Sequence, residues 1–251
     1  MIIDCHWHVY FDAYEENIQK SINDLKRCNI DQCALMFYQG LYQKEEDLHL
    51  QGEALKKVMK VHKEHFVPFL VIDPNIDFGI IKEGVEEYLL KGPAVAVKVH
   101  NSMVVDRKEF EPLAKLLSLH GIPVLIHCWY KTVQKYKDES DPFNIVNLAI
   151  KYPELKIIMA HLTGCGYRGI QDIQKYPNIY LDTSGSQPED GFMQYGLDLL
   201  GAHRLLFGSD FPGRDPATQL GRIYSVDMSE EDRNLILGGN AVELFGGAFH
   251  E

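Results

Sequence analysis

The sequence begins with two histidines separated by one residue, His6 and His8, at the end of a short apolar run. Alternate residues of a β-strand point to the same side, so the two imidazoles would approach a common point closely enough to chelate one cation. Such a pair also occurs by chance at a strand end, and a metal site requires further ligands.

Three more side chains that bind metals, His127, His161 and Asp210, each follow a separate apolar run of the chain. An ionised carboxylate such as Asp210 is costly to bury without a partner, and a metal would supply the counter-charge. A set of nitrogen and oxygen ligands without a thiolate favours Zn²⁺, with Mn²⁺ or Fe²⁺ as alternatives. The sequence therefore predicts a divalent metal site built from residues that are far apart in the chain.

The elements that must position these residues are short apolar runs, which alternate with stretches of helical periodicity. The runs are Ile2–Cys5, Gln32–Phe37, Val67–Ile72, Ala94–Val99, Pro123–Ile126, Lys156–Met159, Ile179–Leu181 and Arg204–Phe207. The helical stretches cover residues 15–28, 51–65, 80–91, 109–121, 143–152 and 191–201. Residues 229–246 predict a closing pair of helices with Ser229 as the N-cap.

Strands that are apolar on both faces are typical of a parallel sheet covered by helices. Eight such strands with intervening helices predict an α/β fold of the (β/α)8 TIM-barrel type, whose strand ends open on one mouth that carries the active site. An open doubly wound sheet is the second choice, but the segment from Cys5 to His8 lacks the glycine-rich phosphate turn of that fold. No linker-like segment divides the chain, so residues 1–251 are expected to form a single domain.

The composition argues against two classes of binding partner. There are 36 acidic and 25 basic residues, the formal net charge is −11, and no run of basic residues occurs. This argues against nucleic acids and anionic membranes, which require a cationic surface. Five cysteines without a CxxC pair, no signal peptide and no long apolar stretch indicate a cytoplasmic protein with reduced thiols. A small-molecule substrate is the expected partner, and a homodimer is left open.

The chain resembles the amidohydrolase superfamily in segments that occur in the order MIIDCHWHVY, AVAVKVHN, VLIHC, IIMAHLTG, NIYLDTSG, LLFGSDFP and LILGGNAVELFG. Within it, the chain resembles the branch of amidohydrolase-related barrels that includes aminocarboxymuconate semialdehyde decarboxylase. The resemblance implies a metal held by His6, His8, His127 and Asp210. It also implies that His161 lies near the metal-bound water and acts as acid or base, or binds a second metal.

Lys98 and His100 lie at the end of the fourth apolar run and share strand parity, so both are expected to point into the mouth. Lys98 matches the position at which phosphotriesterase-like and dihydroorotase-like relatives carry a carboxylated lysine that bridges two metals. In relatives with a single metal this lysine faces the substrate instead, and a lysine paired with a nearby carboxylate is a third option. The sequence therefore predicts one or two metal ions.

Other residues near the predicted mouth concern the substrate. Arg168 and Arg214 are candidates for binding a substrate carboxylate through the guanidinium fork, with exposed salt bridges as the alternative. Four aromatic residues in loops at the same mouth are expected to line an organic pocket: Tyr38, Tyr42, Trp129 and Tyr130. The segment 162–168 is expected to be a glycine-bearing loop, and strand parity places Cys5 and Cys128 on the helix side, away from the metal.

The leading interpretation is a metal-dependent hydrolase. A metal-activated water, with its proton taken by Asp210, would attack a small amide, ester or lactone while His161 assists charge development. The alternative is non-oxidative decarboxylation, or hydration, of a small unsaturated carboxylic acid, with His161 handling the proton. A catalytically inactive barrel that only binds a ligand is the third hypothesis, but it predicts a missing ligand residue, and none is missing from the sequence.

Overall fold

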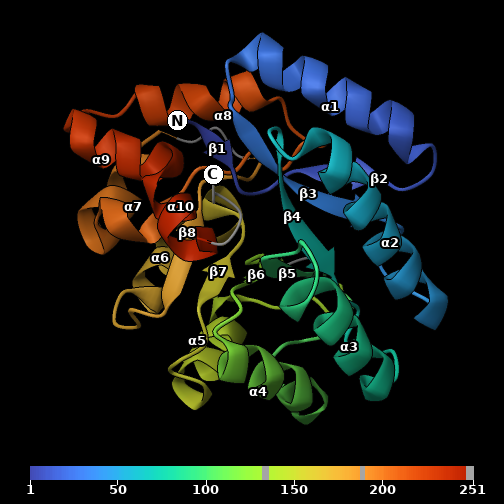
Figure 1. Ribbon diagram of the computed structural model, residues 1–251. Coiled ribbons are helices and arrows are strands. Elements are labelled where there is room, and N and C mark those ends of the chain that lie inside the picture. Colours follow the sequence, from blue (N-terminus) through green and yellow to red (C-terminus); the bar gives the residue numbers. More distant parts are fainter. Residues whose placement is uncertain (132–135, 187–189, 247–251) are drawn as a thin grey trace.

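Parallel strands form a ring that is surrounded by helices (Figure 1). The computed structural model describes residues 1–131, 136–186 and 190–246 of the chain. The strands are β1 (Ile3–Asp4), β2 (His8–Tyr10), β3 (Gln32–Tyr38), β4 (Phe66–Val71), β5 (Ala96–Val99), β6 (Val124–Ile126), β7 (Ile157–Met159), β8 (Ile179–Asp182) and β9 (Leu205–Leu206). They pair in the order β1-β3-β4-β5-β6-β7-β8-β9, and β2 also pairs with β3. Cys5 N donates a hydrogen bond of 2.8 Å to Phe207 O, which joins the first strand to the last and confirms the predicted barrel.

The helices cover the outside of the ring and one of its ends. They are α1 (Tyr14–Cys28), α2 (Glu45–His62), α3 (Phe78–Val85), α4 (Glu111–His120), α5 (Pro142–Lys151), α6 (Leu162–Ile173), α7 (Phe192–Leu200), α8 (Pro216–Tyr224), α9 (Glu230–Asn234) and α10 (Asn240–Phe245). Two π-helical turns, Glu86–Leu90 and Leu235–Gly239, extend α3 and join α9 to α10, and 3₁₀ turns occur at Lys108–Phe110 and Ala202–Arg204. No helix in the described part of the chain is long and apolar enough to cross a membrane.

Every run predicted as a strand forms one within two residues of its predicted bounds, whereas the helices differ in three places. Helix α2 begins at Glu45, six residues before the predicted start of that helix. The segment after His161, predicted as a loop, is the start of α6, and the helical run is interrupted at Gly166, where φ is 64°. Gly164 serves close packing, because a Cβ there would lie 2.9 Å from the Trp129 ring. Helix α8 was not predicted. Ser229 caps α9 as predicted, since its Oγ accepts from Asp232 N at 3.0 Å.

The first strand contains one extra residue between β1 and β2. Asp4 pairs with Cys33, but His8 pairs with Met36, so four steps along the first strand match three along β3. Such a bulge changes strand parity. The prediction that Cys5 faces the helices is therefore wrong, because this residue lies with Met36 in the cluster inside the barrel. Cys128 does lie in the helix-facing cluster, as predicted.

One end of the barrel interior is closed by α10. Its residues Leu244 and Phe245 belong to the same buried cluster as Met36, Phe69 and Leu125, which project inward from the strands. The rings of Phe69 and Phe245 are 5.0 Å apart at an interplanar angle of 67°, an edge-to-face contact. This apolar plug fills the end of the barrel and leaves the polar strand ends at the other.

We expect Phe245→Ala to lower the free energy of unfolding by about 3–5 kcal/mol, because it removes a buried ring and leaves a cavity under Phe69. The measurement is urea denaturation. The matched control is Phe143→Ala, which removes a ring that is 64% exposed and should change stability by about 0.5 kcal/mol or less. Equal effects of the two substitutions would contradict the plug.

Candidate metal centre

The ends of the first and last strands bring His6, His8 and Asp210 to one point in the mouth of the barrel. The Nε2 atoms of His6 and His8 are 3.1 Å apart. Asp210 Oδ1 lies 3.4 Å from each of these two nitrogens. Asp210 N also donates to His6 O at 2.8 Å, which ties the two strand ends together. These three side chains form one of two groups among the described residues whose ligand atoms are close enough to hold one metal ion.

The hydrogen bonds around His6 fix which of its nitrogens faces this point. Its Nδ1 lies 2.7 Å from Asp182 Oδ2, and both side chains are fully buried. Burial raises the pKa of Asp182, but the electrostatic interaction with the His6 ring and the hydrogen bonds from His6 and Ser184 outweigh this and hold the pKa below its usual range. An ionised carboxylate only accepts, so Nδ1 carries a proton, and in the neutral ring Nε2 presents the lone pair. Asp182 therefore aims His6 Nε2 at His8 and Asp210.

The donor atoms at this point fit a divalent cation. Burial lowers the pKa of His8 to about 4, so its imidazole is neutral near pH 7, the form that binds metals. Burial raises the pKa of Asp210, but the hydrogen bond from His8 and the electrostatic interactions with the His6 and His161 rings lower it well below the usual range. Two imidazoles and a carboxylate in mutual contact are the ligands expected for Zn²⁺ or Mn²⁺.

His161 and His127 form a second layer next to this group. The ring of His161 stacks on that of His6 at 5.0 Å, and its Nε2 lies 3.2 Å from His127 Nδ1. Ser184 Oγ donates to Asp182, so it accepts from His161 Nδ1 at 2.8 Å. The structure thus brings His127 beside the group without placing its nitrogens among those of His6, His8 and Asp210, and its role as a ligand stays a prediction.

The backbone of two of these residues adopts the left-handed region. φ is 73° at His161 and 67° at Asp210, which is uncommon for residues other than glycine. Hydrogen bonds hold both, because His161 N donates to Asp182 Oδ1 at 3.0 Å and Asp210 N donates to His6 O. Such conformations cluster at functional sites, where the surrounding structure over-determines them.

Lys98 and His100 both point into the mouth, as their parity predicted. Lys98 Nζ lies 3.2 Å from His6 Nε2 and is fully buried. Burial lowers its pKa to about 8, while the charges of Asp182 and Asp210 act in the opposite direction. The His100 ring lies 5.1 Å from that of His8, and burial lowers its pKa well below the usual value. Carboxylation of Lys98 and a second metal remain predictions.

A cavity of about 310 Å³ opens above these residues. It is lined by His6, His8, Tyr10, Tyr38, Leu41, Lys98, His100, Asn101, His127, Trp129, His161, Asp210, Pro212 and Gly213. Tyr38 and Trp129 were predicted to line it. Tyr42 and Tyr130 are not among its lining residues, and Tyr10 was not predicted. The cavity therefore combines a floor of metal-binding side chains with aromatic walls.

The predicted arginines lie elsewhere. The Arg168 guanidinium stacks over the Tyr130 ring at 4.8 Å, and Arg214 donates to Gly213 O. Neither lines the cavity, so their positions do not support the prediction that they bind a substrate carboxylate there. Among the described residues that line the cavity, Lys98 is the only lysine, and none is an arginine.

Three residues of the site were missed. Asp182 follows the apolar run Ile179–Leu181 just as the predicted ligands follow theirs, so the same reasoning could have found it. Ser184 comes two residues later and lacks any pattern of its own. Glu139, which lies 2.9 Å from His127 Nε2, is in a loop whose sequence gives no signal.

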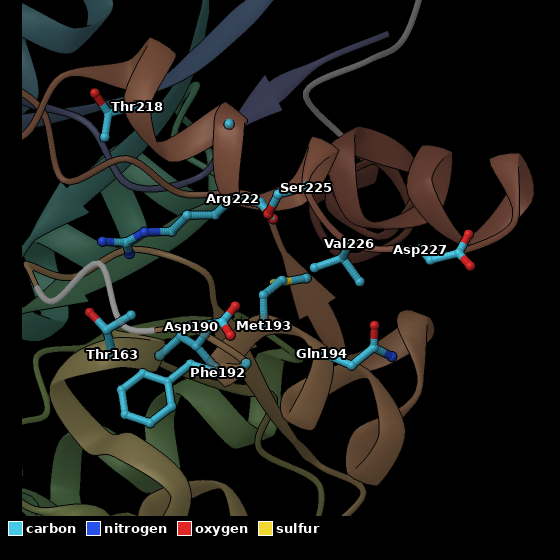
Figure 2. Close-up of a pocket in the computed structure, with 13 residues that line it drawn as sticks. Thr163, Asp190, Phe192, Met193, Gln194, Thr218, Arg222, Ser225, Val226 and Asp227 are labelled. Carbon is cyan, nitrogen blue, oxygen red and sulfur yellow. Dashed lines mark hydrogen bonds between the residues drawn. The ribbon is translucent and has the colours of Figure 1, made fainter.

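A larger cavity of about 470 Å³ lies to one side, between the starts of α6 and α7 and helix α8 (Figure 2). Figure 2 shows Arg222 extending from α8 toward the side on which Thr163 and Thr218 lie. The described residues that line this larger cavity include Asp190 and Asp227 but none of the predicted site residues. The smaller cavity is therefore the candidate reaction site.

Comparisons with known proteins bear on the family and the fold of the chain. A family model described as amidohydrolase matches residues 57–247. Over 116 residues the chain is 33% identical to gamma-resorcylate decarboxylase of Polaromonas sp. strain JS666, a match that covers 38% of this chain and 35% of that protein. The match thus spans about a third of the length of this relative.

Two solved structures share the fold. The 2,6-dihydroxybenzoate decarboxylase from Rhizobium superposes with a TM-score of 0.79 at 14% identity and covers 98% of both chains. A dihydroxybenzoic acid decarboxylase from Polaromonas sp. JS666, with bound manganese and the inhibitor 2-nitroresorcinol, superposes with a TM-score of 0.76 at 16% identity. That match covers 98% of this chain and 96% of the other. At these identities the likeness shows the barrel fold.

We expect the double substitution of His6 and His8 by alanine to abolish uptake of Zn²⁺ and Mn²⁺, because it removes both nitrogen ligands beside Asp210. The barrel should stay folded, since its stability comes from the apolar strands and helices. Metal content after dialysis and circular dichroism are the measurements. The control replaces the exposed His120 and His203 by alanine. Stoichiometric metal in the His6 and His8 variant would rule out this site.

The burial of Asp4 leads us to expect that the stability of the protein depends on pH. Its Oδ1 accepts from His6 N and Ser209 N, its Oδ2 is buried without a partner, and burial raises its pKa to about 7. The folded state thus binds this proton more tightly than the unfolded chain does. Its contribution to stability is complete below pH 3.8 and is lost as the pH rises to about 7.

We expect Asp4→Asn, which keeps the accepting oxygen, to remove this loss. Relative to the variant, the metal-free natural protein should lose about 1.4 kcal/mol of unfolding free energy per pH unit between those two values. Urea denaturation at several pH values is the measurement. Parallel stability curves for the two proteins would show that Asp4 is ionised in the fold.

Proposed function

This chain belongs to the amidohydrolase family, and on that premise we propose that it catalyses metal-dependent, non-oxidative decarboxylation of a small aromatic carboxylic acid. The relatives described above are named as decarboxylases, two of them of dihydroxybenzoic acids, which supports the alternative left open by the sequence. Hydrolysis of an amide, ester or lactone, which the sequence favoured, is not confirmed.

The observation that carries the proposal is the composition of the 310 Å³ cavity. This volume is at the lower end of ligand pockets, about 300–1,000 Å³, and favours a substrate with a single ring. Tyr10, Tyr38 and Trp129 offer aromatic faces to such a ring. Lys98 and the cluster around Asp210 lie at the floor, where polar substituents of the ring would bind.

His6, His8 and Asp210 would hold the metal, with His127 as a further ligand. Zn²⁺ was the first choice from the ligand types, and the manganese in a relative of the same fold makes Mn²⁺ equally worth testing. When bound, the metal supplies positive charge that orients and polarises the oxygen atoms of the substrate. The aromatic walls would set the plane of the ring.

His161 is suited to move the proton. Its Nδ1 is held by Ser184, so the neutral ring presents a lone pair on Nε2. Nε2 takes the proton of a hydroxyl group ortho to the carboxylate and delivers it to the ring carbon that carries the carboxylate. The carbon–carbon bond then breaks, its electron pair restores the aromatic ring, and CO₂ leaves. A proton from water restores the hydroxyl, so the reaction requires no oxidant or reductant.

Lys98 would stabilise the charge that develops in this step. Its ammonium group lies within the cavity floor, shielded from water, where a charge-assisted hydrogen bond is stronger than in solvent. The negative charge left on the hydroxyl oxygen by proton removal is the natural partner. The net charge of −11 does not attract an anionic substrate, so this local cation and the metal would provide its binding energy.

The test is incubation of the Mn²⁺- or Zn²⁺-loaded protein with 2,6-dihydroxybenzoate and other single-ring hydroxybenzoates. We expect CO₂ and the decarboxylated phenol in equal amounts, and in D₂O one deuterium on the carbon that carried the carboxylate. Small aryl esters, anilides and lactones are tested in parallel for hydrolysis. Hydrolysis without any CO₂ release would overturn the proposal in favour of the hydrolase.

His161→Ala provides the control for the proton step. We expect it to lower kcat by about 10²–10⁴-fold, the range for loss of a general acid or base. The metal content of this variant should match that of the natural protein, because the nitrogens next to Asp210 Oδ1 belong to His6 and His8 and not to His161. Unchanged kcat would remove His161 from the mechanism.

A further inference from the structure

Glu139 is a buried carboxylate directly outside the cavity. Its side chain is fully buried, and its Oε1 lies 2.9 Å from His127 Nε2. The nitrogen on the other side of the same ring, Nδ1, faces His161 Nε2 at 3.2 Å. His127 is thus held between a carboxylate on the loop and the histidine cluster.

The backbone next to Glu139 is fixed to the barrel. Ser140 O accepts from Trp129 N at 3.0 Å, and Ser140 Oγ accepts from Val105 N at 3.1 Å. Ser140 also forms a parallel β-bridge with Cys128, the residue after His127. Glu139 therefore approaches His127 from a segment that is bonded alongside β6.

The charge of Glu139 is maintained despite its burial. Lys131 Nζ donates to Oε1 at 3.0 Å and also lies 5.2 Å from the centre of the Trp129 ring. The ammonium group of Lys131 supplies the counter-charge that favours the ionised form of this buried carboxylate. An ionised Glu139 only accepts hydrogen bonds.

This contact selects one form of the His127 ring. Because Glu139 accepts, the proton of the neutral imidazole resides on Nε2 and the lone pair is on Nδ1. That lone pair points toward His161, on the side of the metal cluster. Carboxylates that accept the second N–H of a ligating histidine fix its tautomer and orientation and raise its basicity.

We propose that Glu139 is a positioning residue that holds His127 with its Nδ1 lone pair directed at the metal centre, so that His127 binds the metal through Nδ1. The inference rests on the proposed metal site of His6, His8 and Asp210. Glu139 does not lie at the end of a strand, so it adds a residue of another kind to those that shape the metal site.

The experiment measures the affinity of the protein for Mn²⁺ by titration calorimetry in the absence of substrate. We expect Glu139→Gln to weaken binding about 10–100-fold, the range found when an outer partner of a ligand is lost. Glu139→Asp, which keeps the charge but shortens the side chain, should also weaken it and serves as the second variant. Glu154→Gln, an exposed change of the same chemistry, is the matched control and should leave affinity unchanged.

A double-mutant cycle with His127→Ala separates positioning from a general structural effect. If Glu139 acts through His127, Glu139→Gln should cause no further loss of affinity once the His127 ring is absent. Equal losses in the two backgrounds, or undiminished affinity in both Glu139 variants, would overturn the inference while leaving the metal site intact. Absence of Mn²⁺ binding by the natural protein would overturn the proposed site itself, and this inference with it.

Discussion

The Asp182 carboxylate connects three strand ends at the mouth of the barrel. It accepts from His6 Nδ1 at 2.7 Å, from His161 N at 3.0 Å and from Ser184 N at 2.9 Å, and it is fully buried. Burial alone would favour its protonated form, but the interaction with His6 and the hydrogen bonds from His6 and the Ser184 hydroxyl keep it ionised. The orientation of His6 and the unusual backbone of His161 both depend on this one acceptor.

The consequence is a cluster whose lone pairs point inward. Asp182 and Glu139 take up the outer protons of His6 and His127, so each ring offers its other nitrogen to the centre. The nearest nitrogens of His6 and His8 and the Asp210 oxygen lie 3.1–3.4 Å apart, close enough to bind one cation together. The arrangement is therefore one that a divalent metal would stabilise, and the aromatic walls above it favour a single-ring substrate.

Much of this site could be predicted from the sequence because strand ends of a barrel converge. The spacing of His6 and His8, and the positions of Asp210 and Lys98 after apolar runs, were sufficient to place them together. The bulge that turns Cys5 inward was not predictable, because the register is set by pairing with β3 and not by local pattern. Glu139 lies in a loop, and only tertiary hydrogen bonds bring it to His127.

We propose that His6, His8 and Asp210 share one divalent metal. Anomalous diffraction from crystals of the Mn²⁺-loaded protein, recorded above and below the manganese absorption edge, tests this most directly. We predict a single strong peak within about 2–2.5 Å of His6 Nε2, His8 Nε2 and an Asp210 oxygen. A manganese peak elsewhere in the barrel, or none in the mouth at full metal loading, would contradict it.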